Sequence, residues 1–138
     1  MSSEIEWYVA DLMVRISVEG TTETVVHRNT VLVQANNDDE AHRRALELGE
    51  AYNSSHENPA GKLVTTGFVG LVDLSHVDDA LEHGAELWFS ETIVPSTFAL
   101  NEAIPGKQAL TLFSPRKASR IDYRSREVVD LMKKISGD

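Results

Sequence analysis

Residues 29–52 read NTVLVQANNDDEAHRRALELGEAY, and within them the spacing of apolar side chains changes from every second residue to a helical period. The part up to Ala35 alternates as a half-buried β-strand does. Asn37 is placed to accept hydrogen bonds from the free N–H groups of the first helical turn, with Glu40 three residues further on. Asp38 and Asp39 put negative charge at the positive end of the helix dipole. The stretch therefore predicts a strand that leads directly into a capped helix.

The predicted helix spans residues 38–53 and carries one apolar stripe, at Ala41, Ala45, Leu48 and Tyr52. Three small residues, Ala41, Ala45 and Gly49, follow one another at intervals of four. Because small side chains allow close approach, we expect this helix to lie close to a sheet.

Upstream, residues 8–18 place apolar side chains at every even position, which predicts a long strand with one core face. Trp7, Val9 and Met13 make the opposite face partly apolar as well, so we expect something to cover it. Gly20-Thr21-Thr22 predicts a loop that leads into a second strand at residues 25–35.

Downstream of the helix, the sequence predicts a loop at residues 53–61, a third strand at 62–74, a capped helical turn at 75–84 and a fourth strand at 86–94. Gly67 and Gly70 interrupt the third strand and indicate a bulge or a close backbone approach. The predicted fold is α+β: an antiparallel-rich ββαββ sheet with one packed helix, over residues 1–94.

Residues 95–138 are predicted to form a linker and a C-terminal helical extension. The helix is expected at 115–135, where apolar side chains recur at Ile121, Val128, Leu131, Met132 and Ile135. Such a helix is marginal in water on its own. We therefore expect it to dock, in the same chain or a symmetry mate, over the face that carries Trp7, Val9 and Met13.

The composition narrows the classes of function. A chain of 138 residues suits one core, and its 41% hydrophobic and 25% charged residues are ordinary for a globular protein. It has no cysteine, which excludes disulfides, thiolate nucleophiles and Cys-ligated zinc. Its N-terminus lacks a signal peptide and no apolar run approaches the roughly 18 residues that span a bilayer, so we expect a soluble, cytoplasmic protein.

Charge is unevenly distributed along the chain. Residues 1–100 hold 5 Lys/Arg against 17 Asp/Glu, whereas residues 101–138 hold 8 against 5. The acidic part disfavours nucleic acid and anionic membranes as partners and favours a basic protein. The basic side chains of the tail, at Arg116, Lys117, Arg120, Arg124 and Arg126, suit docking against an acidic domain or, less well, RNA.

Four short motifs resemble those of DUF4288, a bacterial domain family of unknown function. They are Trp7-Tyr8-Val9-Ala10, Asp38-Asp39-Glu40-Ala41, Phe68-Val69-Gly70-Leu71-Val72-Asp73-Leu74 and Gly84-Ala85-Glu86-Leu87-Trp88. The resemblance covers roughly residues 6–92 and implies the ββαββ arrangement. It implies no activity, cofactor or site residue.

Two groups of side chains are candidates for chemistry. On a helical turn, His76, Asp79 and His83 would share one face and could bind a zinc-like cation. Helix capping is the simpler explanation, since Asp78 and Asp79 complement the first turn and His83 the last carbonyls before Gly84.

The second group, which could hold a general base, comprises Tyr8, Asp11, His27 and Tyr52. Tyr8 and Tyr52 also lie on apolar stripes and fit a core role. Gly67-Phe-Val-Gly70 spells a G-x-x-G motif but lies in an apolar strand without a basic residue, and no phosphate-loop, G-x-S-x-G or H-E-x-x-H motif occurs.

Two functions follow as hypotheses. The first is a non-enzymatic protein-interaction module that acts as a homo-oligomer, binds a basic protein partner and needs no cofactor. The alternative is a small enzyme or a ligand- or metal-binding protein that uses His76, Asp79 and His83, or the region of Tyr8 and His27.

Overall fold

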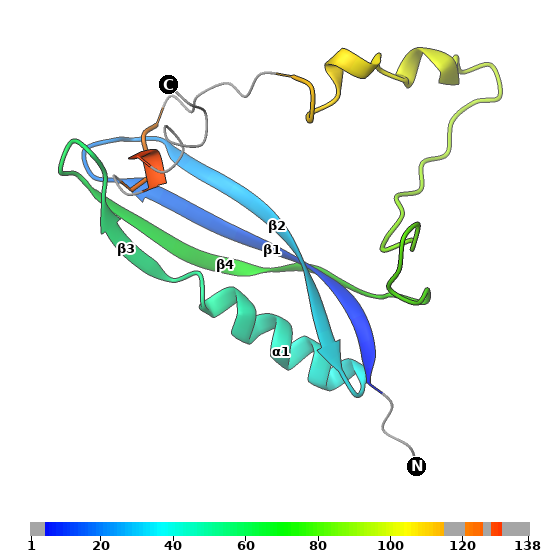
Figure 1. Cartoon of the computed structure of the whole chain (residues 1–138), viewed down its shortest axis with the longest axis horizontal. Helices are drawn as coiled ribbons and strands as arrows, with labels where there is room; N and C mark the ends of the chain where they lie inside the picture. Colours follow the sequence, from blue (N-terminus) through cyan, green and yellow to red (C-terminus); the bar gives the residue numbers. More distant parts are fainter. Residues whose placement is uncertain (1–4, 115–120, 126–127, 131–138) are drawn as a thin grey trace. The chain divides into compact units, whose positions relative to one another are not determined.

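A computed structural model describes residues 5–114, 121–125 and 128–130. Four strands form one antiparallel sheet in the order β2-β1-β4-β3, and α1 packs against one of its faces (Figure 1). In chain order the elements are β1 (Glu6–Val18), β2 (Thr24–Ala35), α1 (Asp38–Glu50), β3 (Ser54–Glu57), β4 (Leu63–His76) and two short 3-10 turns, η1 (Leu100–Ala103) and η2 (Lys107–Ala109). The predicted α+β class and the ββαββ order are confirmed.

β1 and β2 form a long hairpin, paired without interruption from Glu6↔Ala35 to Ser17↔Thr24. Gly20, in the turn between them, has φ +86°, a left-handed conformation that glycine adopts without a steric penalty. On its other side β1 pairs with β4, and the register shifts twice, between Asp11 and Leu12 and between Met13 and Val14. The predicted irregularity near Gly67 and Gly70 is therefore a pair of bulges.

The predicted cap of α1 is present. The Asn37 side-chain oxygen accepts from the N–H of Glu40 at 2.8 Å, and the Glu40 carboxylate accepts from the N–H of Asn36 at 3.2 Å. The helix ends at Glu50, three residues before the predicted end, because the N–H of Tyr52 bonds to the carbonyl of Gly49 and closes a tighter turn.

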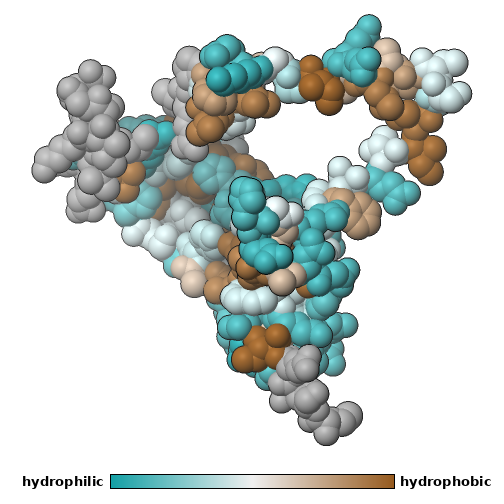
Figure 2. Space-filling view, turned by 45° about the vertical axis from the view of Figure 1, so that its right-hand side comes forward, coloured by the Kyte–Doolittle hydropathy of each residue, from teal (hydrophilic) through white to brown (hydrophobic). Residues whose placement is uncertain are grey.

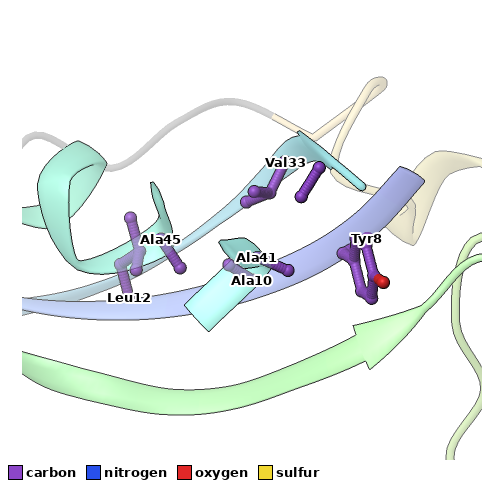
Figure 3. Close-up of a cluster of buried hydrophobic side chains, with 7 residues drawn as sticks. Tyr8, Ala10, Leu12, Val33, Ala41 and Ala45 are labelled. Carbon is purple, nitrogen blue, oxygen red and sulfur yellow. The ribbon is translucent and has the colours of Figure 1, made fainter. Parts of the chain in front are cut away.

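The close approach of α1 to the sheet is confirmed. Ala41 and Ala45 are fully buried against Ala10, Leu12 and Val33 (Figure 3). Gly49 is tighter still, because a Cβ at that position would lie 2.4 Å from ring atoms of Phe68 on β4. Small side chains thus set the distance between helix and sheet.

The third predicted strand, at 62–74, is present as β4, whereas the fourth predicted strand was wrong. Residues 86–94, predicted as a strand, have no regular secondary structure, and the sheet is completed instead by β3, within the predicted loop 53–61. β3 reads SSHE, which has no apolar alternation. It is a strand because the turn that follows it brings β4 alongside as a pairing partner. Asn58 shapes that turn, since its side-chain oxygen accepts from the N–H groups of Ala60 and Lys62.

The predicted helical turn at residues 75–84 was also wrong, because β4 continues to His76. A tight turn follows later, in which the N–H of Ala85 bonds to the carbonyl of Glu82 and Gly84 has φ +87°. β4 extends beyond the predicted end of the strand at Leu74 because the start of β1 pairs with it there, with Tyr8 opposite His76.

Two compact units divide the chain: residues 1–88 with 121–138, and residues 89–120. The boundary after Trp88 lies six residues before the predicted one at 94. In the second unit the described residues form η1 and η2 and connecting segments. No helix in the described part of the chain is long and apolar enough to cross a membrane.

The predicted C-terminal helix at 115–135 is not continuous, because residues 121–125 are not helical. Residues 128–130 are helical, whereas Leu131, Met132 and Ile135 lie outside the described residues. Ile121 and Tyr123 pack against Ile16, Val18 and Val64. These contacts lie on the face of the sheet that also carries α1, at its opposite end, and not over Trp7, Val9 and Met13.

Candidate functional site

The face of the sheet opposite α1 carries a small pocket. Its volume is about 110 Å³, and it is lined by Val9, Asp11, Arg28, Thr30, Asp73, Ser75 and Trp88. Side chains of β1, β2 and β4 alternate between the two faces of the sheet, so the odd positions of β1 point to this face. We call this hollow the Trp88 pocket.

Strand register explains how the pocket residues meet. Asp11 lies in the middle of β1, directly opposite Thr30 on β2 and Asp73 on β4. Ser75 is opposite Val9. Trp88 arrives from the segment that follows β4, and its side chain is 57% exposed.

Asp11 is the central polar group of the pocket. Its Oδ2 accepts a hydrogen bond from Nη2 of Arg28 and forms an ion pair with it. Its Oδ1 is buried and has no hydrogen-bond partner within the part of the chain that the structure describes. A buried carboxylate oxygen without a donor is unfavourable, typically by about 1–3 kcal/mol, so Asp11 retains an unused capacity to accept a hydrogen bond.

Asp73 adds a second carboxylate directly across the strand pair. Like charges in that position destabilise a sheet, and Arg28 offsets them. The pKa of Arg28 is raised above its usual range by the hydrogen bond to Asp11 and, further, by the charges of Asp11 and Asp73. Ser75 Oγ donates to Asp73 Oδ2 at 3.3 Å. With two carboxylates and one guanidinium, the pocket has a formal charge of −1.

This arrangement can bind a cation with N–H donors. A guanidinium or ammonium group is small enough for the pocket and is attracted by its net negative charge. Asp11 Oδ1 has almost no exposed surface, so a donor reaches it only when the surrounding side chains move. The exposed indole of Trp88 supplies an aromatic face, on which such cations gain a further cation–π interaction.

A second polar cluster joins β1, α1 and β4 at one end of the sheet. Tyr8, which is 2% exposed, donates its hydroxyl to Asp38 Oδ1 at 2.9 Å and lies 3.3 Å from Glu6 Oε2. His76 Nδ1 lies 2.7 Å from Asp78 Oδ1, and its Nε2 lies 3.1 Å from Glu6 Oε2. The rings of Tyr8 and His76 meet edge to face at 5.2 Å.

The electrostatics of this cluster suit a clamp rather than proton transfer. Burial, and then the hydrogen bond to Asp38, raise the pKa of Tyr8 far above its usual value, so that the phenol stays protonated and acts as a donor. The pKa of His76 is also raised, first by its hydrogen bond to Asp78 and then by the charge of Glu6, against an opposing effect of burial. The cluster holds together the start of β1, the start of α1 and the end of β4.

The first predicted set of site residues, His76, Asp79 and His83, is not brought together on a helical face. His76 ends β4, Asp79 Oδ2 accepts from the N–H of Glu86 at 3.0 Å, and His83 lies in the turn that ends at Ala85. No group of three or more His, Asp or Glu side chains that could hold a metal ion occurs among the described residues, which include all three.

The second predicted set is also divided. Tyr8 and His27 face the same side of the sheet but are about six residues apart along β1, since His27 pairs with Val14; this is roughly 20 Å. His27 packs edge to face on Tyr123, and Tyr52 packs against the core beside α1. Of this set, only Asp11 lines the Trp88 pocket.

Sequence reasoning missed five polar or aromatic pocket residues: Arg28, Thr30, Asp73, Ser75 and Trp88. Asp11 was a candidate, and its position on the odd-numbered face of β1, opposite the core face, was recognisable. Its partners depend on the strand order β2-β1-β4 and on a bulged register, which alternation of side chains does not encode. Trp88 was missed because residues 86–94 were taken for a strand.

Comparison with known proteins agrees with this architecture. The model of the family described as "Domain of unknown function (DUF4288)" matches residues 7–89, which include the sheet, α1 and Trp88. No curated protein and no solved structure matches the chain. The family match covers more than half of the chain and confirms the resemblance seen in the four sequence motifs; the chain belongs to the DUF4288 family.

Proposed function

We propose that this protein is a non-enzymatic, cytoplasmic protein-interaction module that acts as a homo-oligomer and binds a basic protein partner through the Trp88 pocket. The observation that carries the proposal is a pocket walled by Trp88 and lined by Asp11, whose buried Oδ1 has no hydrogen-bond partner among the described residues. The group that fits is the guanidinium of an arginine or the ammonium of a lysine side chain on the partner.

The balance of charge supports a basic partner. Residues 1–100 carry 5 Lys/Arg against 17 Asp/Glu, so a basic protein is attracted from a distance before any contact forms. The side chain of Arg28 is 56% exposed, and its ion pair uses Oδ2 of Asp11. Asp73 therefore remains as a second carboxylate that can accept a hydrogen bond from a cationic partner. The absence of cysteine supports a cytoplasmic location.

Exposed apolar side chains further support an interaction role. Figure 2 shows apolar residues (brown) at the surface of the chain among hydrophilic ones (teal). In residues 89–114 the large apolar side chains that are exposed are Phe89, Ile93, Phe98, Leu100, Ile104, Leu110, Leu112 and Phe113. So many apolar side chains in one short segment mark a surface that takes part in contacts.

Tryptophan fluorescence tests the pocket directly. In a Trp7→Phe background Trp88 is the remaining tryptophan, and its emission is titrated with Nα-acetyl-arginine amide and with the uncharged citrulline analogue. We expect saturable quenching by the arginine compound that weakens as salt is added. Asp11→Asn is expected to weaken it about tenfold, because a charge-assisted hydrogen bond is lost.

The matched control is Asp39→Asn, which removes the same charge from the exposed first turn of α1. It is expected to leave the titration unchanged. Equal quenching by the citrulline analogue, or equal weakening in Asp39→Asn, would show that the pocket does not recognise a cation and would overturn the proposal.

A further inference from the structure

The two edges of the sheet differ in how far their backbone is covered by other parts of the chain. On the β4 side, β3 pairs with Leu63–Thr66, and the Asn53 side-chain oxygen accepts from the N–H of Phe68 at 2.7 Å. Further along, the two bulges in the pairing of β4 with β1 interrupt the regular course of the strand. Short covering strands, side-chain caps and bulges are the devices by which proteins keep a free edge from pairing with other chains.

β2 forms the other edge and lacks these devices. It pairs with β1 along its whole length, from Thr24 to Ala35, without a bulge. It contains no proline and no lysine, and Arg28 is its single Asp, Glu, Lys or Arg residue. Among the described residues outside the sheet, contacts with β2 include a hydrogen bond from Nη1 of Arg44 to the carbonyl of Gln34 at 2.6 Å and the packing of Tyr123 on His27. Twelve residues make an edge of roughly 40 Å that can accept another strand.

The side chains of this edge are suited to burial. Val26 and Leu32 are 55% and 43% exposed, and Val25 and Val31 are half-buried. β-Branched side chains opposite one another stabilise an antiparallel pair. An added strand would bury apolar surface on both faces of the sheet.

A hollow at the C-terminal end of β2 provides further space. It measures about 460 Å³ and is lined by Trp7, Leu32, Val33, Gln34, Arg44, Glu47 and Leu48, from β1, the edge strand and α1. In an antiparallel pair of two β2 strands, the N-terminal end of the second strand lies beside the C-terminal end of the first. That pairing brings Val25 and Val26 of a second copy to this hollow.

We infer that the β2 edge is the contact through which two copies of this chain pair, antiparallel and about a two-fold axis near the middle of β2. A strand that pairs antiparallel with itself is its own complement, as a two-fold interface requires. Residues 1–100 carry a net negative charge, so two copies of the chain repel each other over most of this surface. β2 carries no acidic residue, and its edge lacks that repulsion. A basic partner gains nothing from an edge whose one charged residue is Arg28, which leaves a second copy as the better occupant.

This inference rests on the homo-oligomer of the proposed function and assigns its contact to the edge of β2, the strand that also contributes Arg28 and Thr30 to the Trp88 pocket. Light scattering of the full chain is expected to give twice the subunit mass of 15.3 kDa. Leu32→Glu replaces an apolar side chain that the added strand would bury by a charge, so its dimer dissociation constant is expected to rise about tenfold or more.

A matched control exists for this substitution. Val72→Glu changes a side chain on β4 that is 44% exposed, against 43% for Leu32. The second pair is Val26→Glu and Val69→Glu, at 55% and 51%. Variants on β2 are expected to be monomeric at concentrations where variants on β4 remain dimeric, and all four are expected to keep the far-ultraviolet spectrum of the folded chain.

Single cysteines report the geometry, because the natural chain contains none. Asn29→Cys and Thr30→Cys lie in the middle of β2, and at least one is expected to form a disulfide-linked dimer on mild oxidation. Thr65→Cys, exposed on β4, is the control and is expected to stay uncrosslinked.

The outcomes separate the two proposals. A dimer that resists Leu32→Glu and Val26→Glu, or that crosslinks at Thr65 and not in β2, overturns the β2 contact and leaves the homo-oligomer standing. A monomeric natural chain overturns both, while binding of a cation at the Trp88 pocket stays a separate measurement.

Discussion

At the scale of single residues, the cluster around Tyr8 and His76 ties the stability of the fold to pH. Folding raises the pKa of His76 above its usual value of about 6.5, because Asp78 and Glu6 favour the imidazolium. Its stabilising effect is therefore complete below about pH 6.5, where His76 is charged in both the folded and the unfolded state. The effect is lost as the pH rises through the raised pKa of the folded state.

We therefore predict that the natural chain loses stability relative to His76→Gln as the pH increases from about 6 to 8. Urea unfolding of both proteins at a series of pH values measures the difference. His42→Gln removes an exposed imidazole from α1 and serves as the control. A difference that stays constant or grows with pH would show that Asp78 and Glu6 do not stabilise the charged ring.

At the scale of elements, the contact between α1 and β4 depends on Gly49. Alanine at this position would favour the helix by about 1 kcal/mol, but its Cβ would lie 2.4 Å from the ring of Phe68. Overpacking of this kind typically costs about 1–3 kcal/mol. The two effects oppose each other, and we predict that Gly49→Ala lowers the free energy of unfolding by up to about 2 kcal/mol.

The same substitution made in Phe68→Ala tests the cause. Without the ring the clash is absent, so Gly49→Ala is expected to stabilise that variant by up to about 1 kcal/mol. Chemical unfolding of the four proteins forms a double-mutant cycle. An effect of Gly49→Ala that is identical in both backgrounds would mean that Phe68 is not the obstacle.

At the scale of the whole first unit, the segment that follows residue 120 completes the core. Ile121 and Tyr123 cover Ile16, Val18 and Val64, at the end of the sheet that α1 does not reach. Hydrogen bonds from β3 and the turn after it help to hold the segment: Asn58 Nδ2 donates to the carbonyl of Asp122 at 3.1 Å, and His56 Nε2 lies 2.9 Å from the carbonyl of Tyr123.

Removal of the Tyr123 side chain is expected to destabilise the first unit by about 2–3 kcal/mol, because half-buried aromatic surface and its contact with His27 are lost. Thermal unfolding of Tyr123→Ala measures the effect. Phe98→Ala removes a ring that is 51% exposed in residues 89–120 and is expected to change the midpoint little. Equal midpoints for the two variants would mean that Tyr123 does not contribute to the core.

The charge of the whole molecule gives the two proposed contacts opposite dependences on salt. Screening weakens repulsion between two acidic copies, so self-association is expected to strengthen between about 0.01 and 0.3 M salt. Binding of a cationic group at the Trp88 pocket is expected to weaken over the same range. Sedimentation and fluorescence titrations at matched salt measure both. Self-association that weakens with salt would indicate an interface of opposite charges, not the β2 edge.

The sequence alone determined the elements whose signals are local. The hairpin strands, the cap at Asn37 and the small residues of α1 were all predictable, because alternation, capping and side-chain size act within a few neighbouring residues. The resemblance to DUF4288 was recognisable from such local motifs too, and the family model matches residues 7–89.

Only the tertiary structure decided which distant segments pair. β3 has a polar sequence and exists because β4 lies beside it, whereas residues 86–94 alternate as a strand does and form none. The pocket likewise assembles from Asp11, Asp73 and Trp88, which strand order and two bulges bring together from positions far apart in the chain. Pairing is selected by the free energy of the whole sheet, in which a residue's partners lie dozens of positions away, and this is why no local pattern in the chain encodes it.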